Sequence, residues 1–114
     1  MMSANVISRK LETLQQKAAM RSVDVANVLG IRPETVSRWN QGKAFPRSDV
    51  ERTLLDLEYV VDQLADLYEP DEARLWLFSR QKLLGGKRPA DLIQQGRTDE
   101  VLQVLRQLLE GVYV

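Results

Sequence analysis

The sequence of 114 residues contains no cysteine and no histidine. Without cysteine the chain has no disulfide framework, and a cytoplasmic location is the default expectation. The chain also lacks the usual zinc ligands and the commonest general base of enzymes. Catalysis would have to depend on carboxylates, lysine, tyrosine or hydroxyl groups, and no pair of these forms a recognisable constellation. We therefore expect no enzymatic activity, metal site, cofactor or small-molecule substrate.

Long apolar runs are lacking as well. No run approaches the roughly 20 apolar residues of a membrane helix, and residues 1–10 lack the apolar core of a secretory signal. Apolar residues make up 44% of the chain and charged residues 28%, which is the balance of a folded globular protein and not of a disordered one. The sequence therefore predicts a folded protein that does not enter a membrane.

The net charge is zero, but the charges are unevenly distributed along the chain. The chain has 16 basic and 16 acidic residues, yet up to Arg52 nine basic residues face five acidic ones, so this part carries +4 and the remainder carries −4. A basic first half indicates nucleic acid as one partner, and an acidic second half indicates a different one. Chance variation on a solvated surface is the alternative explanation.

Apolar residues recur at helical spacing throughout, and no alternating β pattern is present, so we expect an all-α fold. Residues 1–47 are predicted to form a DNA-binding region and residues 48–114 a helical protein-binding region. Three helices are expected to start at polar caps, namely Ser22, Ser48 (with Glu51 as a capping box) and Thr98. Two others are expected to start at Pro33 and Pro70.

Residues 22–41 have the pattern of a helix-turn-helix. Ala26 is small enough to let two helix backbones approach closely, and Gly30 can adopt the left-handed turn conformation. Val36 and Trp39 are then expected to seal a small core, and the second helix is free to enter a major groove. The predicted DNA-binding residues on and after this helix are Arg32, Glu34, Thr35, Ser37, Arg38, Gln41, Lys43 and Arg47.

Two of these residues have distinct expected roles. Arg38 can donate two hydrogen bonds to a guanine edge, whereas Lys43, in the following loop, is suited to phosphate. An ion pair between Arg38 and Glu34, four residues apart, is the competing interpretation. The stretch TVSRWNQGK from Thr35, with Pro46 beyond it, resembles the Xre family of helix-turn-helix regulators over roughly the first 46 residues. This resemblance implies operator binding as a dimer.

The second half carries a different set of motifs: AxxWxFS from Ala73, LL at 83–84, RPADL from Arg88 and EGVYV at the end. From about Leu57 onward this set resembles the toxin-binding domain of the Xre/MbcA/ParS antitoxins, with the MbcA type fitting best. The resemblance implies that this half binds and silences a RES-domain toxin that consumes cellular NAD. Arg80 and Gln81 stand where many relatives have Pro-Asn, so contacts at this place are expected to differ.

The chain ends on an apolar segment. Gly111 is expected to end the last helix, which leaves a tail with a terminal carboxylate and an aromatic anchor for a partner's cleft, or a tail that folds back on its own core. The aromatic residues and leucines of this half can also be plain core. The predicted toxin-binding residues are Trp76, Phe78, Arg80, Leu84, Arg88, Gly111, Val112, Tyr113 and Val114.

These observations favour an antitoxin of the RES–Xre type, with a RES-domain toxin and operator DNA as partners. A stand-alone dimeric repressor, whose second half only dimerises or senses a signal, is the main alternative. A structural adaptor with a vestigial helix-turn-helix is a third.

Overall fold

The computed structural model describes residues 4–112, and this range contains helices, turns and no β-strand. It confirms the predicted all-α class. The elements in chain order are α1 (Ala4–Ala18), α2 (Ser22–Leu29), α3 (Pro33–Asn40), α4 (Ser48–Leu64), α5 (Pro70–Phe78), the 3-10 turn η1 (Lys82–Leu84), α6 (Pro89–Gln94) and α7 (Thr98–Val112).

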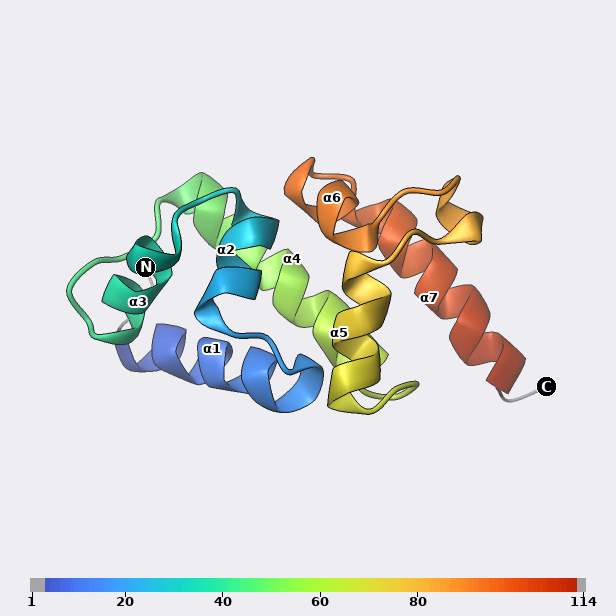
Figure 1. Ribbon diagram of the computed structural model, residues 1–114, viewed down its shortest axis with the longest axis horizontal. Helices are drawn as coiled ribbons and strands as arrows, with labels where there is room; N and C mark the ends of the chain where they lie inside the picture. Colours follow the sequence, from blue (N-terminus) through green and yellow to red (C-terminus); the bar gives the residue numbers. More distant parts are fainter. Residues whose placement is uncertain (1–3, 113–114) are drawn as a thin grey trace.

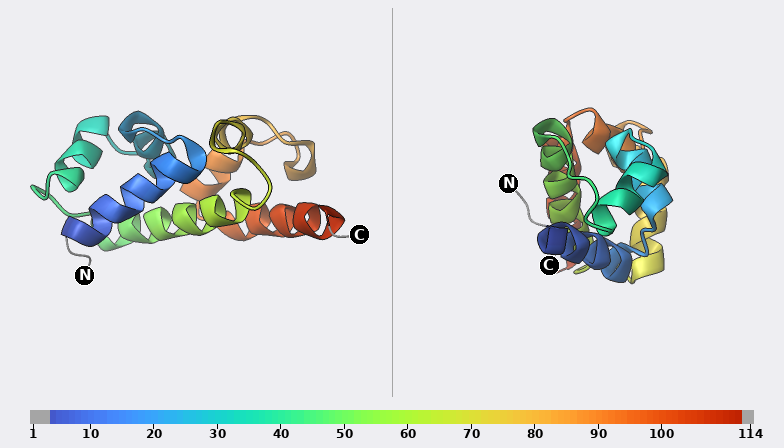
Figure 2. Two further views of the ribbon diagram at one scale, coloured as in Figure 1. Left: turned by 90° about the horizontal axis from the view of Figure 1, so that it is seen from below. Right: turned by 90° about the vertical axis from the view of Figure 1, so that its left-hand side faces the viewer.

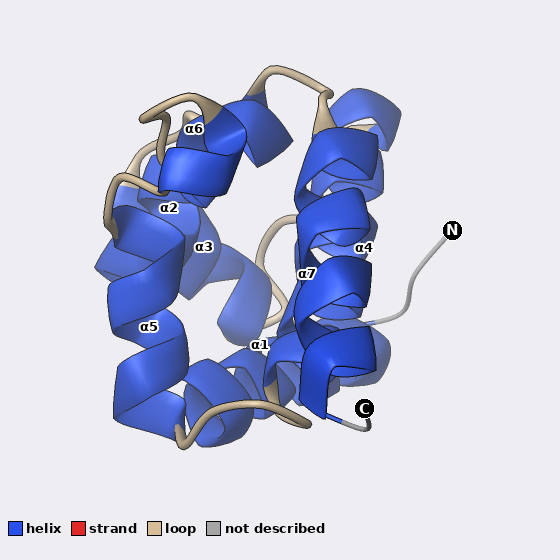
Figure 3. Cartoon of the chain, turned by 90° about the vertical axis from the view of Figure 1, so that its right-hand side faces the viewer, coloured by secondary structure: helices blue, strands red, loops and turns tan. Residues whose placement is uncertain are grey.

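The helices form an elongated body of 46 × 23 × 22 Å. Helices α4 and α7 follow one another along one side, and α2, α5 and α6 lie opposite them (Figures 2 and 3). Helix α1 contacts α3, α4 and α5 and so joins the two sides. Helix α3 lies at one end of the long axis and the last turn of α7 at the other (Figure 1), which separates the two predicted binding functions in space.

A single hydrophobic core runs through the body. Buried residues of the first half, such as Ile7, Leu14 and Val28, belong to the same cluster as Leu57 and Leu105 of the second half. The boundary predicted at residue 47 coincides with the start of α4, but the residues on its two sides share this core.

Ion pairs add to the contact between α1 and α4. Lys10 lies 2.7 Å from Glu58, and Lys17 lies 2.7 Å from Asp62. The first of these pairs is largely shielded from solvent and the second is about half exposed. Helix α1 is thereby fixed along α4 by both apolar and charged contacts.

Two helices begin at proline as predicted, and three begin at the residues predicted as caps, Ser22, Ser48 and Thr98. Pro33 and Pro70 are each the first residue of their helices, where the missing N–H is not needed. Ser22 and Ser48 were expected as caps, but each lies inside its helix, and the caps are Arg21 and Arg47. Thr98 donates its hydroxyl to Asp56 of α4 at 3.1 Å. This hydroxyl therefore ties α7 to α4.

Gly111 does not end the last helix. Helix α7 continues through it to Val112, and Gly111 is not among the glycines with a positive φ. A glycine within a helix keeps helical backbone angles when the helix continues on both sides, so the prediction of a stop at this residue is wrong.

Candidate functional site

The helix-turn-helix depends on the close approach of α2 and α3. Ala26 and Val36 are 1% and 0% exposed, and Trp39 is 2% exposed, which confirms their predicted core positions. Gly30 has φ +69° and donates its N–H to the carbonyl of Ala26, which also accepts the N–H of Ile31 at 3.0 Å. The left-handed residue thus ends α2 and starts the turn into α3.

The predicted DNA-binding residues lie in α3 and in the segments directly before and after it. Arg32, Glu34, Arg38, Gln41, Lys43 and Arg47 are exposed, and Thr35 and Ser37 are half-buried. Within residues 4–112, the side chains of Arg32, Arg38 and Lys43 have no hydrogen bond or ion pair. Three cations at this end of the molecule are therefore available to an anionic partner.

The competing interpretation of Arg38 is not supported. Arg38 and Glu34, both in the described part of the chain, form no ion pair. Arg47 does have a partner, Asp49, at 3.8 Å, but both side chains are mostly in solvent. Such an exposed contact contributes little and leaves Arg47 accessible.

The predicted toxin-binding residues are divided between the core and the surface. Trp76 and Leu84 are each 8% exposed, so most of both side chains belongs to the core. Phe78 is half-buried, with the guanidinium of Arg74 5.8 Å above its ring. Arg80, Arg88 and Gly111 are exposed. Val112 is the last residue of α7, and Tyr113 and Val114 lie outside the described residues.

A closed loop follows α5. Gln81 pairs with Lys87 in an isolated antiparallel β-bridge, and its backbone N–H donates to the carbonyl of Lys87 at 3.1 Å. Its side-chain amide donates to the carbonyl of Trp76 at 3.0 Å. Sequence analysis missed this bridge, because a single pair of residues produces no alternating pattern.

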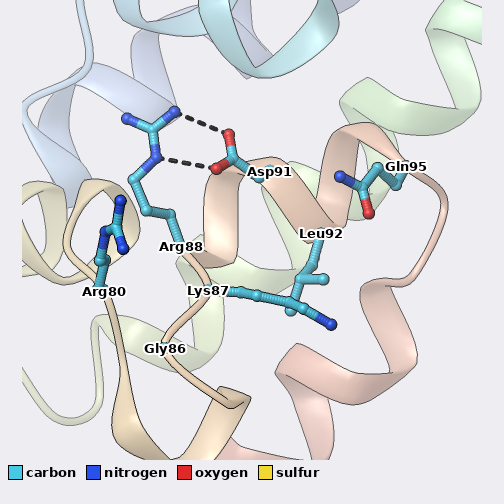
Figure 4. A pocket seen from close by; sticks show the side chains of 7 residues that line it. All are labelled: Arg80, Gly86, Lys87, Arg88, Asp91, Leu92 and Gln95. Carbon is cyan, nitrogen blue, oxygen red and sulfur yellow. Dashed lines mark hydrogen bonds and ion pairs between the residues drawn. The ribbon is translucent and has the colours of Figure 1, made fainter.

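The loop forms one wall of an open pocket of about 590 Å³ (Figure 4). The pocket is lined by Arg80, Gly86, Lys87, Arg88, Asp91, Leu92 and Gln95. Arg88 donates to Asp91 through Nε at 2.9 Å and through Nη2 at 2.8 Å. These hydrogen bonds lower the pKa of the Asp91 carboxyl, and burial opposes them. The charges of Arg88 and Arg80 lower this pKa further, so it lies below its ordinary value.

A second open groove lies between α5, η1 and α7, with a volume of about 350 Å³. Tyr68, Trp76, Leu83, Val104 and Leu108 supply its apolar lining, and Leu83 is 62% exposed. Arg80 lines this groove as well as the first pocket. The exposed edge of Trp76 therefore faces a concave surface beside the predicted cationic residues.

A bidentate ion pair between the two halves involves Asp24, which sequence patterns did not single out. The carboxylate of Asp24 in α2 accepts hydrogen bonds from Arg74 in α5, at 2.8 and 3.2 Å, and from the backbone N–H of Arg21 at 2.9 Å. Asp24 is the one charged residue that is buried in the described range. A carboxylate 50 residues from its partner gives no sequence signal for the pair.

No helix in the described range is long and apolar enough to span a membrane.

Comparison with known proteins gives relatives along the whole chain. Residues 63–111 match the family described as the antitoxin Xre/MbcA/ParS C-terminal toxin-binding domain. The mycobacterial cidal antitoxin MbcA of Mycobacterium tuberculosis, and that of Mycobacterium bovis, are each 31% identical over 113 residues, which cover 99% of this chain and 100% of the relative. A probable mycobacterial cidal antitoxin of M. tuberculosis is 33% identical over 93 residues, covering 81% of this chain and 78% of the relative.

A solved structure extends this likeness to the fold. A chain in the crystal structure of the M. tuberculosis MbcT–MbcA toxin–antitoxin complex superimposes with a TM-score of 0.82 and 31% identity, covering 96% of this chain and 99% of that one. These relatives are antitoxins, which are not enzymes, in agreement with the expectation from the missing catalytic groups. The chain belongs to the MbcA-type antitoxins of the Xre/MbcA/ParS family.

Proposed function

We propose that this antitoxin binds and neutralises a RES-domain toxin that degrades NAD, and that it represses its own operon by binding operator DNA, both in the cytoplasm. The observation that carries the first part is the match of nearly the whole chain to a chain of the MbcT–MbcA toxin–antitoxin complex. A stand-alone repressor does not account for a match that includes the second half, where residues 63–111 fit a toxin-binding domain.

Toxin binding is assigned to the end of the molecule formed by α5, η1 and α7. The groove lined by Trp76, Leu83 and Leu108 is concave and partly apolar, which suits a protein partner. Helix α7 ends at Val112 at this end of the molecule, and Tyr113 and Val114 follow it in the sequence. An apolar segment with Tyr113 as an aromatic anchor suits insertion into a partner's cleft, so we propose that inhibition is occlusion of the NAD site.

DNA binding is assigned to α3. Arg32, Arg38 and Lys43 are exposed cations at the opposite end of the long axis from the last turn of α7 (Figure 1). One short recognition helix makes few base contacts, so we propose a dimer that reads an inverted repeat with half-sites about 34 Å apart. Footprinting tests the dimer. Protection of a single half-site by one chain would contradict it.

Co-expression tests the antitoxin part. The protein encoded beside this chain's gene, expressed alone, should stop growth and deplete cellular NAD, and the intact antitoxin should prevent both effects. Arg38→Ala serves as the matched control, because it removes a DNA contact from the far end of the molecule and should neutralise the toxin as well as the unchanged chain. Growth arrest with unchanged NAD contradicts the proposed toxin chemistry, and continued arrest in the presence of the antitoxin contradicts the partnership.

A further inference from the structure

Arg80 and Arg88 face each other across the loop that Gln81 and Lys87 close. In an antiparallel pair, the residue before one bridge partner lies opposite the residue after the other, so the bridge brings these two arginines together. Figure 4 shows their side chains side by side at the wall of the pocket. Like charges held opposite one another destabilise a fold, so stability gives no reason for this arrangement.

Only one carboxylate lines the pocket beside these cations. Asp91 engages Nε and Nη2 of Arg88, which fixes the guanidinium and leaves its Nη1 without a partner among the described residues. Arg80 and Lys87 have no side-chain hydrogen bond or ion pair within residues 4–112. The pocket therefore retains excess positive charge on a preorganised framework.

The excess stands out against the rest of this half. Residues 80–88 contain four basic and no acidic residues, although the chain after Arg52 carries −4 in total. Gly85 and Gly86 have no side chains, and nothing lies within 4 Å of the position a Cβ would take at either residue. A ligand group can therefore approach the loop from solvent.

We propose that the pocket between Arg80 and Arg88 binds a carboxylate of the toxin, an aspartate or glutamate side chain, and that Arg80 selects the cognate toxin through it. This inference rests on the proposed toxin partnership. The planar guanidinium of Arg80 can donate two parallel hydrogen bonds to a carboxylate, and Nη1 of Arg88 is the nitrogen that remains for a further one. DNA phosphate fits the position less well, because α3 lies at the end of the body away from the loop that carries η1 (Figure 1).

The test compares three variants by calorimetric titration with the purified toxin. Arg80→Glu should weaken toxin binding by about tenfold or more, the expected size of a lost charge-assisted hydrogen bond with added repulsion. Arg80→Gln should weaken it less. Arg9→Glu is the matched control, since Arg9 is an exposed residue of α1, outside the proposed toxin-binding end, and the net charge changes by the same amount. It should change the affinity by no more than about threefold, because long-range attraction is largely screened by salt.

Thermal unfolding separates binding from structure. Arg80→Gln should unfold at about the same temperature as the unchanged chain, because the lost repulsion with Arg88 and the lost attraction to Asp91 oppose each other. Equal toxin affinity for Arg80→Glu and the unchanged chain overturns the proposal, as does a loss of operator DNA affinity without a loss of toxin affinity. Failure of the unchanged chain to bind the toxin contradicts the proposed function itself, and the pocket assignment with it.

Discussion

Asp24 in α2 and Arg74 in α5 form a bidentate ion pair, with Nη2 2.8 Å from Oδ1 and Nε 3.2 Å from Oδ2. The Asp24 side chain is 5% exposed and the Arg74 side chain 40%. The pair links the first helix of the helix-turn-helix to the helix that carries Trp76. This ion pair therefore joins the two predicted binding halves. Its carboxylate is buried, and its guanidinium is partly exposed to solvent.

Removal of Arg74 should destabilise the whole fold. Arg74→Ala leaves the Asp24 carboxylate buried with one hydrogen-bond donor, the Arg21 N–H, and with the Arg21 guanidinium 3.8 Å away, and it removes the cation above Phe78. The expected loss of unfolding free energy is about 1–3 kcal/mol, less than for a fully buried pair because Arg74 is partly solvated. Chemical denaturation measures it. Lys17→Ala is the control, because Lys17 and Asp62 are both about half exposed and their pair should contribute little. Equal losses in the two variants contradict this ranking.

The same carboxylate should make stability depend on acid. Burial raises the pKa of the Asp24 carboxyl, but the hydrogen bonds from Arg74 and the Arg21 N–H, together with the two arginine charges, outweigh it and leave that pKa below the ordinary value of 3.8. A carboxyl with a lowered pKa in the folded state stabilises the fold above its unfolded pKa. This contribution is lost as the pH falls from about 4 through the lower folded pKa.

Melting temperature as a function of pH checks this assignment. The unchanged chain should lose stability between pH 4 and the acid limit more steeply than Asp24→Asn, because the amide has no proton to gain. The ion pairs Arg88–Asp91 and Arg97–Glu100 are present in both chains and supply a common background. Identical acid slopes in the two chains exclude Asp24 as a major source of acid sensitivity.

Replacing Gly30 should destabilise the fold mainly through the backbone. Its φ of +69° costs a residue with a Cβ about 1–2 kcal/mol. A Cβ would also lie 2.6 Å from Nε2 of Gln94 in α6, but this atom ends an exposed, flexible side chain that can move aside at little cost. Gly85→Ala is the matched control, since it has φ +66° and no atom within 4 Å of the added carbon. Gly30→Ala should lower stability at least as much as Gly85→Ala, and adding Gln94→Ala should remove the difference. A Gly30→Ala chain that is more stable than the unchanged chain contradicts the predicted backbone strain at residue 30.

Two variants of the proposed DNA-binding surface should distinguish a base contact from a phosphate contact. Arg38→Ala should cost about 1–3 kcal/mol on the cognate operator if Arg38 contacts a base with two hydrogen bonds. Lys43→Ala should weaken all DNA sequences alike and reduce the salt slope of binding by about one unit. Affinity measured against operator and scrambled DNA at several salt concentrations distinguishes the two effects. If both folded variants bind operator as the unchanged chain does, α3 is not the reading helix.

Local sequence patterns predicted α2, the turn at Gly30 and α3 because the determinants of these elements are near neighbours. The small Ala26, the left-handed Gly30 and the proline at residue 33 each act within one turn of backbone. The caps predicted at Ser22 and Ser48 are one residue off, because the preceding arginines occupy the cap positions. Asp24, fixed by Arg74, accepts the N–H of Arg21 and so places the start of α2 one residue earlier than Ser22 suggests.

The toxin-binding half could be predicted only as a set of residue types. The arginines at 80 and 88 were selected as candidates, but their opposition across a one-pair bridge is a property of the folded loop. The burial of Trp76 and Leu84 likewise depends on α6 and α7, which come later in the chain. A periodic pattern shows that a residue lies on the apolar face of a helix, but it does not give the exposed fraction of the side chain that a partner can contact.

The most direct test of the antitoxin function is NAD loss measured against antitoxin concentration for the intact chain and for a chain that lacks residues 112–114. Both should show the same helical circular dichroism, because chain ends contribute little to a core. The intact chain should stop NAD consumption by the toxin, and the shortened chain should not. Tyr113→Ala should lie between them, with binding weakened by about 2 kcal/mol or more if the ring is an interface hot spot. A folded, shortened chain that blocks the toxin at the same concentration contradicts occlusion by the tail, and an intact chain that never slows NAD loss contradicts the proposed function.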